Sequence, residues 1–171
     1  MPHQSQTDKP TIMVVEDFDD TRQLIAVELR SEGYEVVEVS DGREAVEAVR
    51  RRCPDLVLLD LSLPGCDGLS AAFRMREVGA MCQVPIVACT AHDAALHRDA
   101  ALAAGCDEYL TKPLDMGRLK EVVGRLLAER SDGTKKGEAE ARAERITSAR
   151  LDDEGLRDYL DGLMGRAGAP E

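Results

Sequence analysis

Short apolar runs alternate with longer amphipathic segments from residue 11 to about residue 128. Three of these runs, at 11–16, 55–61 and 85–90, are nearly continuous in apolar residues. Strands that are covered on both faces of a parallel sheet have this composition. Two further runs, at 34–39 and 108–111, also have the composition of strands. The pattern therefore predicts five strands.

The segments between the runs have the three- and four-residue spacing of amphipathic helices. The expected helices cover residues 20–32, 43–52, 67–78, 93–104 and 115–129. Gly33, Gly79 and Gly105 follow three of them, at the position where glycine commonly ends a helix. Because parallel strands need crossovers and these are right-handed, the alternation predicts an α/β fold with a doubly wound, five-stranded parallel sheet.

Polar side chains stand where the apolar runs end. Glu16 and Asp17 end the first run, Asp60 ends the third, Thr90 the fourth, and Lys112 follows the fifth. In open α/β sheets, ligands bind at the carboxyl ends of the strands. We therefore expect three carboxylates, one hydroxyl and one ammonium to share a crevice at that edge of the sheet.

The density of acidic residues in "VVEDFDD" (14–20) calls for a positive partner, because neighbouring carboxylates repel one another. Carboxylate oxygens are the ligands that Mg²⁺ prefers in proteins. The sequence therefore predicts a bound Mg²⁺ among Glu16, Asp17 and Asp60, with Lys112 as a further positive charge.

Composition narrows the classes of partner. The chain has 171 residues with 22 Lys and Arg against 33 Asp and Glu, a net charge of −11. Such a charge repels nucleic acid and anionic membranes unless a basic patch is present. The longest basic run, 50–52, is typical of the end of a solvated helix. We therefore expect no nucleic acid and no membrane among the partners.

The cysteines and the N-terminus bear on location. Five scattered cysteines without a C-x-x-C motif argue against disulfides and structural zinc, and fit a reducing, cytoplasmic compartment. No run approaches the roughly 18 apolar residues of a membrane span. Residues 1–10 lack the apolar region of a signal peptide and are interpreted as a disordered leader.

Four motifs in order carry a family resemblance: "VVED", "LLDLSLPGCDG", "CTA" and "YLTKP", each at a predicted strand end. With them, residues 11–128 closely resemble the receiver domain of bacterial two-component response regulators, here of the stand-alone type. The resemblance implies a flavodoxin-like (βα)5 receiver fold with strand order 2-1-3-4-5. It also implies a phosphorylation-dependent signalling switch.

The resemblance assigns a role to each motif. Asp60 would attack a phosphohistidine on a histidine kinase or phosphotransfer protein and become an aspartyl phosphate. Asp17, Asp60 and the backbone carbonyl of Ser62 would ligate Mg²⁺, and Glu16 would act through a metal-bound water. Thr90 and Lys112 would bond the phosphoryl oxygens.

Further positions follow from the same comparison. Tyr109 would be an aromatic switch that turns inward when Thr90 moves, and Ser62 and His92 would tune the lifetime of the phosphoryl group. Glu16 stands where the family more often has Asp, which lengthens that side chain. Leu63 and Cys66 stand where Met is common, and we interpret both as packing substitutions.

Residues 129–171 lie beyond the resemblance. A polar, Gly-interrupted stretch predicts a linker, and a later stripe has the spacing of an amphipathic helix. Its members are Leu156, Tyr159, Leu160, Leu163 and Met164. This tail either docks on its own domain or binds a partner. The partner could be a second copy of the chain, which would give a phosphorylation-dependent homodimer.

We therefore expect a phosphoacceptor regulator, not a turnover enzyme, that dephosphorylates itself and acts on an unidentified protein target. An intermediate carrier that hands its phosphoryl group to another histidine protein remains an alternative. A phosphatase of the haloacid dehalogenase class would need an acid two residues after the nucleophile, where this chain has Ser62. A flavin-binding protein is disfavoured because acids occupy the phosphate-loop position.

Overall fold

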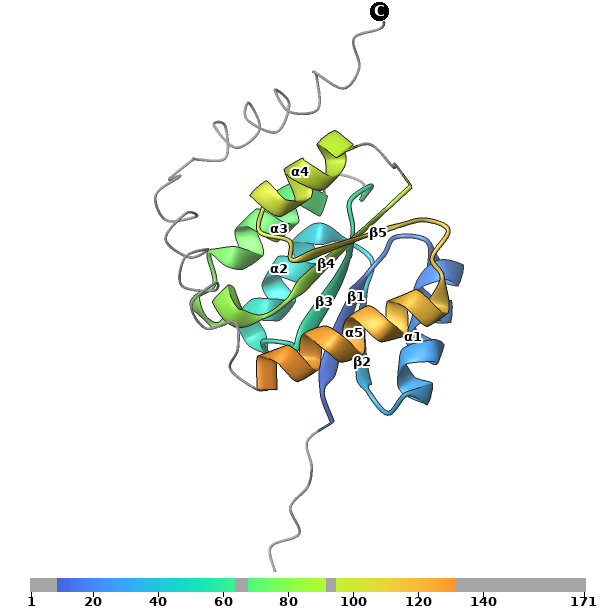
Figure 1. The fold of residues 1–171 in the computed structure, drawn as a ribbon. Coiled ribbons are helices and arrows are strands. Elements are labelled where there is room, and N and C mark those ends of the chain that lie inside the picture. The colour runs from blue at the N-terminus through green and yellow to red at the C-terminus, as the bar shows by residue number, and fades with distance from the viewer. Residues whose placement is uncertain (1–8, 64–67, 92–94, 132–171) are drawn as a thin grey trace, which may run out of the picture.

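The computed structural model describes residues 9–63, 68–91 and 95–131, and within them five strands form one parallel sheet (Figure 1). The strands are β1 (Thr11–Val15), β2 (Glu35–Val39), β3 (Leu56–Asp60), β4 (Ile86–Thr90) and β5 (Glu108–Thr111). Their order is β2-β1-β3-β4-β5, and each neighbouring pair is parallel. The fold and the strand order predicted from the sequence are confirmed.

Helices cover both faces of the sheet. They are α1 (Asp19–Ser31), α2 (Gly42–Arg51), α3 (Gly68–Arg76), α4 (Ala95–Ala103) and α5 (Met116–Ser131). Two cores result, one with α1 and α5 and the other with α2, α3 and α4. Along β1, Ile12 and Val14 enter the first core while Met13 and Val15 enter the second, because successive side chains of a strand point to opposite faces.

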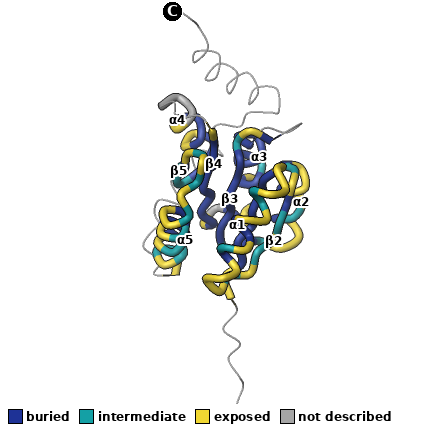
Figure 2. Tube along the Cα trace, turned by 90° about the vertical axis from the view of Figure 1, so that its right-hand side faces the viewer, coloured by how far each residue is buried: buried dark blue, intermediate teal, exposed yellow. Residues whose placement is uncertain are grey.

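Burial follows the position of a strand in the sheet. The three inner strands β1, β3 and β4 are buried at every position, which explains their nearly continuous apolar sequences (Figure 2). The edge strand β2 alternates between exposed and half-buried positions from residue 35 to residue 38 and ends on the buried Val39. Inner strands therefore hold their carboxyl ends, and the polar residues there, against a rigid core.

Two of the three glycines end a helix as expected. Gly33 and Gly105 have φ angles of 93° and 100°, in the left-handed region that glycine adopts without strain. Gly79 was predicted to close a helix over 67–78, and this was wrong. The helix α3 ends at Arg76, and Gly79 instead begins a 3-10 helix, η1 (Gly79–Gln83), that periodicity did not reveal.

The last helix is longer than expected. It continues to Ser131, so residues 130 and 131 extend the helix expected over 115–129 into the segment where the sequence suggested a linker. Most of the expected leader and the rest of the expected tail, residues 1–8 and 132–171, lie outside the described residues. The division of the chain into leader, domain and tail therefore stays a prediction.

A buried arginine joins the elements at the amino end of β4. The Arg76 side chain is 0% exposed and pairs with Asp107 at 2.8 Å. Its guanidinium also donates to the backbone carbonyls of Met81, Val84 and Gly105, at 2.5 to 2.9 Å. Four acceptors offset much of the cost of burying this charge. They fix the end of α3, η1 and the turn before β5 to one another.

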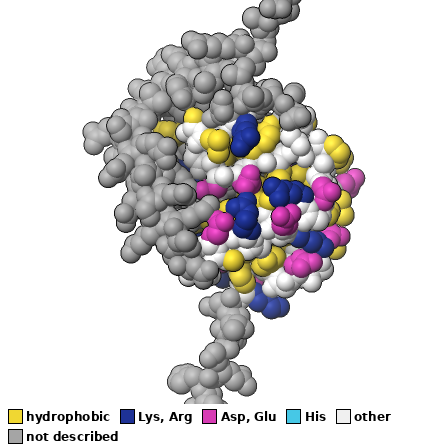
Figure 3. Space-filling view, in the orientation of Figure 1, with side chains coloured by type: hydrophobic (Ala, Val, Ile, Leu, Met, Phe, Trp, Pro, Cys, Tyr) yellow, Lys and Arg dark blue, Asp and Glu magenta, His cyan; other side chains and the backbone are white. Residues whose placement is uncertain are grey.

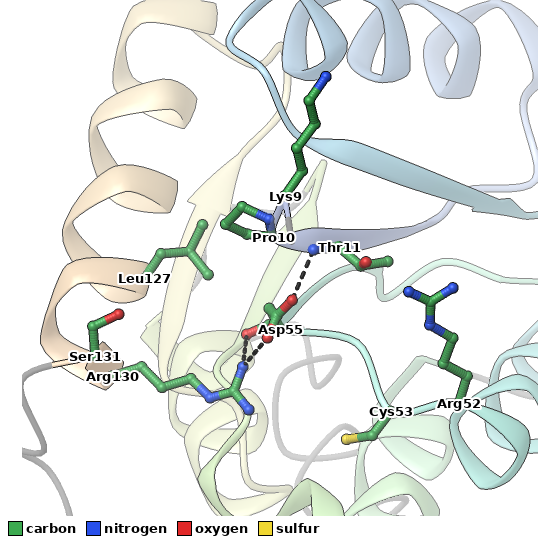
Figure 4. A pocket seen from close by; sticks show the side chains of 9 residues that line it. All are labelled: Lys9, Pro10, Thr11, Arg52, Cys53, Asp55, Leu127, Arg130 and Ser131. Carbon is green, nitrogen blue, oxygen red and sulfur yellow. Dashed lines mark hydrogen bonds and ion pairs between the residues drawn. The ribbon is translucent and has the colours of Figure 1, made fainter. Parts of the chain in front are cut away.

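The end of α5 is fastened to the amino ends of β1 and β3 (Figure 4). Arg130 Nη1 lies 2.6 Å from Asp55 Oδ1, and Asp55 Oδ2 accepts the Thr11 N–H at 2.8 Å. These residues and Ser131 border a pocket of about 500 Å³. The chain therefore leaves α5 at the pole opposite to the carboxyl ends of the strands.

The face formed by α1 and α5 carries charges of both signs (Figure 3). Lys120 pairs with Glu28 at 2.8 Å and with Glu32 at 3.1 Å, and Arg125 pairs with Glu108 at 2.5 Å. Basic side chains on this face thus have acidic neighbours. Across the described parts of the chain, we find no helix with the length and apolar character needed to cross a membrane.

Candidate functional site

Three acidic side chains meet at the carboxyl edge of the sheet. Glu16 and Asp17 follow β1, and Asp60 is the last residue of β3. One carboxylate oxygen from each lies within 4.8 Å of those of the other two. Glu16 and Asp60 are 3% and 4% exposed, whereas Asp17 faces solvent. The convergence expected from the strand ends is therefore present.

Lys112 brings a positive charge into this group from the end of β5. Its Nζ lies 2.5 Å from Glu16 Oε2 and 3.3 Å from Asp60 Oδ2. The Lys112-Pro113 peptide bond is cis. The ammonium therefore partly neutralises two of the three carboxylates.

Burial and charge act against each other at this pair. Burial lowers the pKa of Lys112, but the hydrogen bond to Glu16 and the charge of Asp60 together raise it by more. The pKa of Lys112 is therefore raised overall. Burial raises the pKa of Glu16, and the hydrogen bond from Lys112 opposes that change without cancelling it. The raised pKa of Lys112 favours a charged ammonium, whereas the raised pKa of Glu16 favours a neutral carboxyl. Because two carboxylates face Lys112, its ammonium is charged.

The loop after Asp60 approaches the strand closely. Asp60 Oδ1 accepts the Ser62 N–H at 2.9 Å, which holds the carboxylate over the turn. A Cβ on Gly68, the first residue of α3, would lie 2.4 Å from the Asp60 carbonyl oxygen and 2.5 Å from Leu61 Cα. Only glycine fits there. The Leu63 residue is only 6% exposed, which supports its interpretation as a packing residue.

The remaining predicted residues lie on or beside β4 and β5. Thr90, the last residue of β4, is 1% exposed, and its carbonyl accepts the Lys112 N–H at 2.7 Å. Tyr109 is half-buried against the core with α2, α3 and α4. His92 and Cys66 lie outside the described residues. Thr90 therefore stands at the same edge as the acidic group, next to the strand that carries Tyr109.

One contact at this edge was not anticipated from the sequence. Arg22, on the first turns of α1, donates from Nη1 to the backbone carbonyl of Glu16 at 2.9 Å and from Nη2 to Asp19 Oδ1 at 2.6 Å. In the sequence it resembles any charged residue on a solvated helix. The signal in the sequence was a single arginine shortly after four acidic residues. Its spacing did not indicate which group it would contact.

The donor set fits a hard divalent cation. Three carboxylates within reach of one point suit Mg²⁺, which prefers oxygen ligands and keeps several of its waters. The exposure of Asp17 leaves a side open to solvent for those waters. Glu16, Asp17 and Asp60 are the residues that would hold the ion.

The chain is similar in sequence to a known protein family and to several named proteins. The family model described as response regulator receiver domain matches residues 12–124. The protein named "Probable transcriptional regulatory protein TcrX" of Mycobacterium tuberculosis is 38% identical over 118 residues, which are 69% of this chain and 48% of that protein. The phosphate regulon transcriptional regulatory protein PhoB of Pseudomonas aeruginosa is 34% identical over 94% of this chain and 68% of its own length.

Two solved structures extend the comparison. The receiver domain of sensor histidine kinase PA1611 of Pseudomonas aeruginosa, which has a magnesium ion coordinated in its active site cleft, is 36% identical with a TM-score of 0.66. The receiver domain of the Francisella response regulator 1452 is 26% identical, also with a TM-score of 0.66. They cover 70% and 71% of this chain, and 98% of each of them is covered.

Proposed function

The chain belongs to the response regulator receiver domain family, and on this basis we propose that Asp60 is its phosphoacceptor. The donor is a phosphohistidine on a histidine kinase or a phosphotransfer protein. The observation that carries the proposal is the position of the Asp60 carboxylate, buried at a strand end between two further carboxylates and the Lys112 ammonium.

In the proposed transfer, a carboxylate oxygen of Asp60 attacks phosphorus. The bond between phosphorus and the donor imidazole breaks, and its electron pair stays on the imidazole nitrogen. The Ser62 N–H holds the other carboxylate oxygen and so orients the attacking one. Such a transfer needs positioning and charge neutralisation more than covalent help from the protein.

Bound Mg²⁺ supplies positive charge beside the oxygens of the transferred group. We assign Asp17 and Asp60 as direct ligands together with the Ser62 carbonyl, and Glu16 as a ligand through water. Lys112 then exchanges its contact with Asp60 for one with a phosphoryl oxygen. Asp60 exchanges a single negative charge for roughly two on phosphorylation, which makes the lysine more necessary.

The proposed output is a change of surface. Thr90 moves toward the phosphoryl group and Tyr109 turns inward, so that the surface of α4, β5 and α5 differs between the two states. A protein partner reads that surface in the cytoplasm. The chain acts as a regulator that accepts a phosphoryl group and loses it by autodephosphorylation.

Acetyl phosphate with Mg²⁺ tests the assignment of Asp60. Intact-mass spectrometry should show one phosphoryl adduct on the wild type and none on Asp60→Asn, because the amide is too weak a nucleophile. Asp55→Asn is the matched control, since it changes the same residue type at the opposite end of β3. An adduct on Asp60→Asn would refute the assignment.

A relay role is the second candidate. In this role Asp60 would pass its phosphoryl group to another histidine protein, and the similarity of this chain to the receiver domain of a sensor histidine kinase favours it. Radiolabelled protein incubated with candidate phosphotransfer proteins distinguishes the two roles. Label that moves onto a histidine protein faster than it hydrolyses supports the relay.

The two curated relatives are named as transcriptional regulatory proteins, and the chain spans 48% and 68% of their lengths. The expectation that no nucleic acid is bound therefore stays a prediction, based on the net charge of −11. Binding of a DNA duplex at physiological salt, measured by fluorescence anisotropy, would contradict it.

A further inference from the structure

We propose that Arg22 is a positioning residue for the metal centre, which it serves by fixing the peptide bond between Glu16 and Asp17. The inference rests on the proposed function, since it concerns the same acidic group. It adds a residue outside that group, on α1, to the set that decides how tightly Mg²⁺ binds.

The contact lies at a sensitive point of the backbone. The carbonyl of Glu16 belongs to the peptide bond that joins the two acidic residues, and Arg22 Nη1 donates to it at 2.9 Å. The orientation of this peptide plane determines the positions of the two adjoining Cα atoms. It therefore also determines the directions in which the two carboxylate side chains extend. Because the plane is rigid, a bond to its oxygen restrains both residues together.

The arginine is itself held in place. Its Nη2 lies 2.6 Å from Asp19 Oδ1, its Nε lies 3.7 Å from Glu38 Oε1 on β2, and its side chain is only 14% exposed. A guanidinium can serve three acceptors at once because its donors form a planar fork. Arg22 therefore links α1, β2 and the loop after β1.

Other contacts in this loop hold Glu16 and Phe18. The Glu16 N–H donates to the Val39 carbonyl at 3.0 Å, and the Phe18 N–H donates to Glu16 Oε1 at 3.2 Å. The latter contact engages the carboxylate that also binds Lys112, so it depends on the state of the site. The bond from Arg22 uses no carboxylate of the acidic group, so a bound cation would not compete for its acceptor.

Positioning and plain electrostatics predict opposite results for the removal of Arg22. If the residue acted only through its charge, its loss would remove a cation near a cation site and Mg²⁺ would bind more tightly. If it positions the loop, Mg²⁺ binds more weakly, because this ion demands nearly ideal octahedral geometry. Outer partners of metal ligands are typically worth about tenfold or more in affinity.

Isothermal titration of the metal-free protein with MgCl₂ decides between these results. We expect Arg22→Ala to weaken binding about tenfold, and Arg22→Lys, which keeps one charged donor, to recover part of the loss. Arg30→Ala is the matched control, because Arg30 lies on the same helix and also pairs with Glu38, at 3.0 Å, but does not reach the loop. It should leave the affinity unchanged or slightly higher.

A second readout separates positioning from general damage. The rate of phosphorylation by acetyl phosphate should return to the wild-type value in Arg22→Ala at saturating Mg²⁺, with only the half-saturating concentration raised. If Arg22→Ala does not fold, Arg22→Lys and Arg22→Gln carry the same comparison. Wild-type affinity, or tighter binding, in the folded Arg22 variants overturns the inference. A wild type that binds no Mg²⁺ would instead refute the proposed function.

Discussion

Lys112 Nζ lies 2.5 Å from Glu16 Oε2, although 96 residues separate the two in sequence. The same nitrogen is 3.3 Å from Asp60 Oδ2, so the ammonium is closer to Glu16 than to the proposed phosphoacceptor Asp60. Glu16 reaches the ammonium with a side chain that is one methylene longer than that of aspartate. Lysine and a divalent cation therefore compete for the same carboxylates.

Lys112→Ala should bind Mg²⁺ as tightly as the wild type or more tightly, because a competing cation is removed. It should nevertheless lose the conformational response to beryllofluoride. Asp17→Asn should weaken Mg²⁺ binding by about tenfold or more, because a direct ligand and its charge are lost. Titration calorimetry measures both affinities. An equal loss of affinity in the two variants would contradict this division of roles.

Gly68→Ala should destabilise the protein and impair phosphorylation of Asp60. The added Cβ would lie 2.4 Å from the Asp60 carbonyl oxygen, and backbone must move to relieve the overlap. Overpacking of this kind costs about 1–3 kcal/mol in the free energy of unfolding. Urea denaturation measures the change, and intact-mass kinetics with acetyl phosphate measures the loss of phosphorylation.

Gly124→Ala is the control for Gly68→Ala. A Cβ on Gly124, in the middle of α5, would meet no atom within 4 Å. Alanine at such a helical position stabilises by about 0.5–1 kcal/mol relative to glycine. The two substitutions add the same methyl group and should change stability in opposite directions. A Gly68→Ala variant as stable and as readily phosphorylated as the wild type would refute the steric argument.

Cys89 should resist alkylation at alkaline pH. Burial raises the pKa of its thiol from 9.0 to about 12, an effect that the charge of Lys112 reduces and that of Asp60 increases. Iodoacetamide at pH 9.5 should therefore modify the half-buried Cys53 first and reach Cys89 only in denaturant. Peptide mass mapping distinguishes the two thiols. Rapid modification of Cys89 in the folded protein would contradict its burial.

The same shift has a consequence for stability. Above pH 9 the unfolded chain releases the Cys89 proton while the folded protein keeps it, so the unfolded state gains. The contribution of this thiol is therefore complete below pH 9 and falls as the pH rises toward 12, with a slope of at most about 1.4 kcal/mol per pH unit. Cys89→Ala should show a weaker loss of stability over that range, measured by urea denaturation at several pH values.

The sequence predicted the sheet and the meeting of the acidic side chains because both depend on patterns that a linear chain displays. Buried parallel strands are apolar throughout, and residues after such strands must share one edge. Side-chain reach and backbone targets leave no such pattern. The position of Lys112 beside the acidic group was expected. Its closer approach to Glu16 than to Asp60, and the contact of Arg22 with a carbonyl, depend on the path of the loop after β1, which periodicity does not encode.

Buried charge was the other feature that the sequence concealed. Arginine ordinarily faces solvent, yet the Arg76 side chain is fully buried against Asp107 and three carbonyls. The carbonyls come from Met81 in η1, from Val84 directly after it and from Gly105 in the turn before β5. The turn at Gly105 was expected from the sequence, whereas η1 was not. A buried arginine can be recognised only when its acceptors are known.

Removal of residues 132–171 tests the prediction that the tail serves partner binding or self-association. A chain that ends at Ser131 keeps the bond between Arg130 and Asp55, whereas one that ends at Ala128 loses it together with the last turn of α5. The shorter chain should therefore be less stable for a reason unrelated to the tail. Comparison of the two by thermal unfolding separates these effects.

The chain that ends at Ser131 should be phosphorylated at the wild-type rate, because the site lies at the opposite pole from Ser131. It should lose the phosphorylation-dependent self-association or partner binding of the full chain, since the apolar stripe at 156–164 is absent. Light scattering with and without beryllofluoride, on both chains, measures the difference. Equal behaviour of the two chains, with partner binding retained, would mean that any signal from the site is read on α4, β5 and α5 alone.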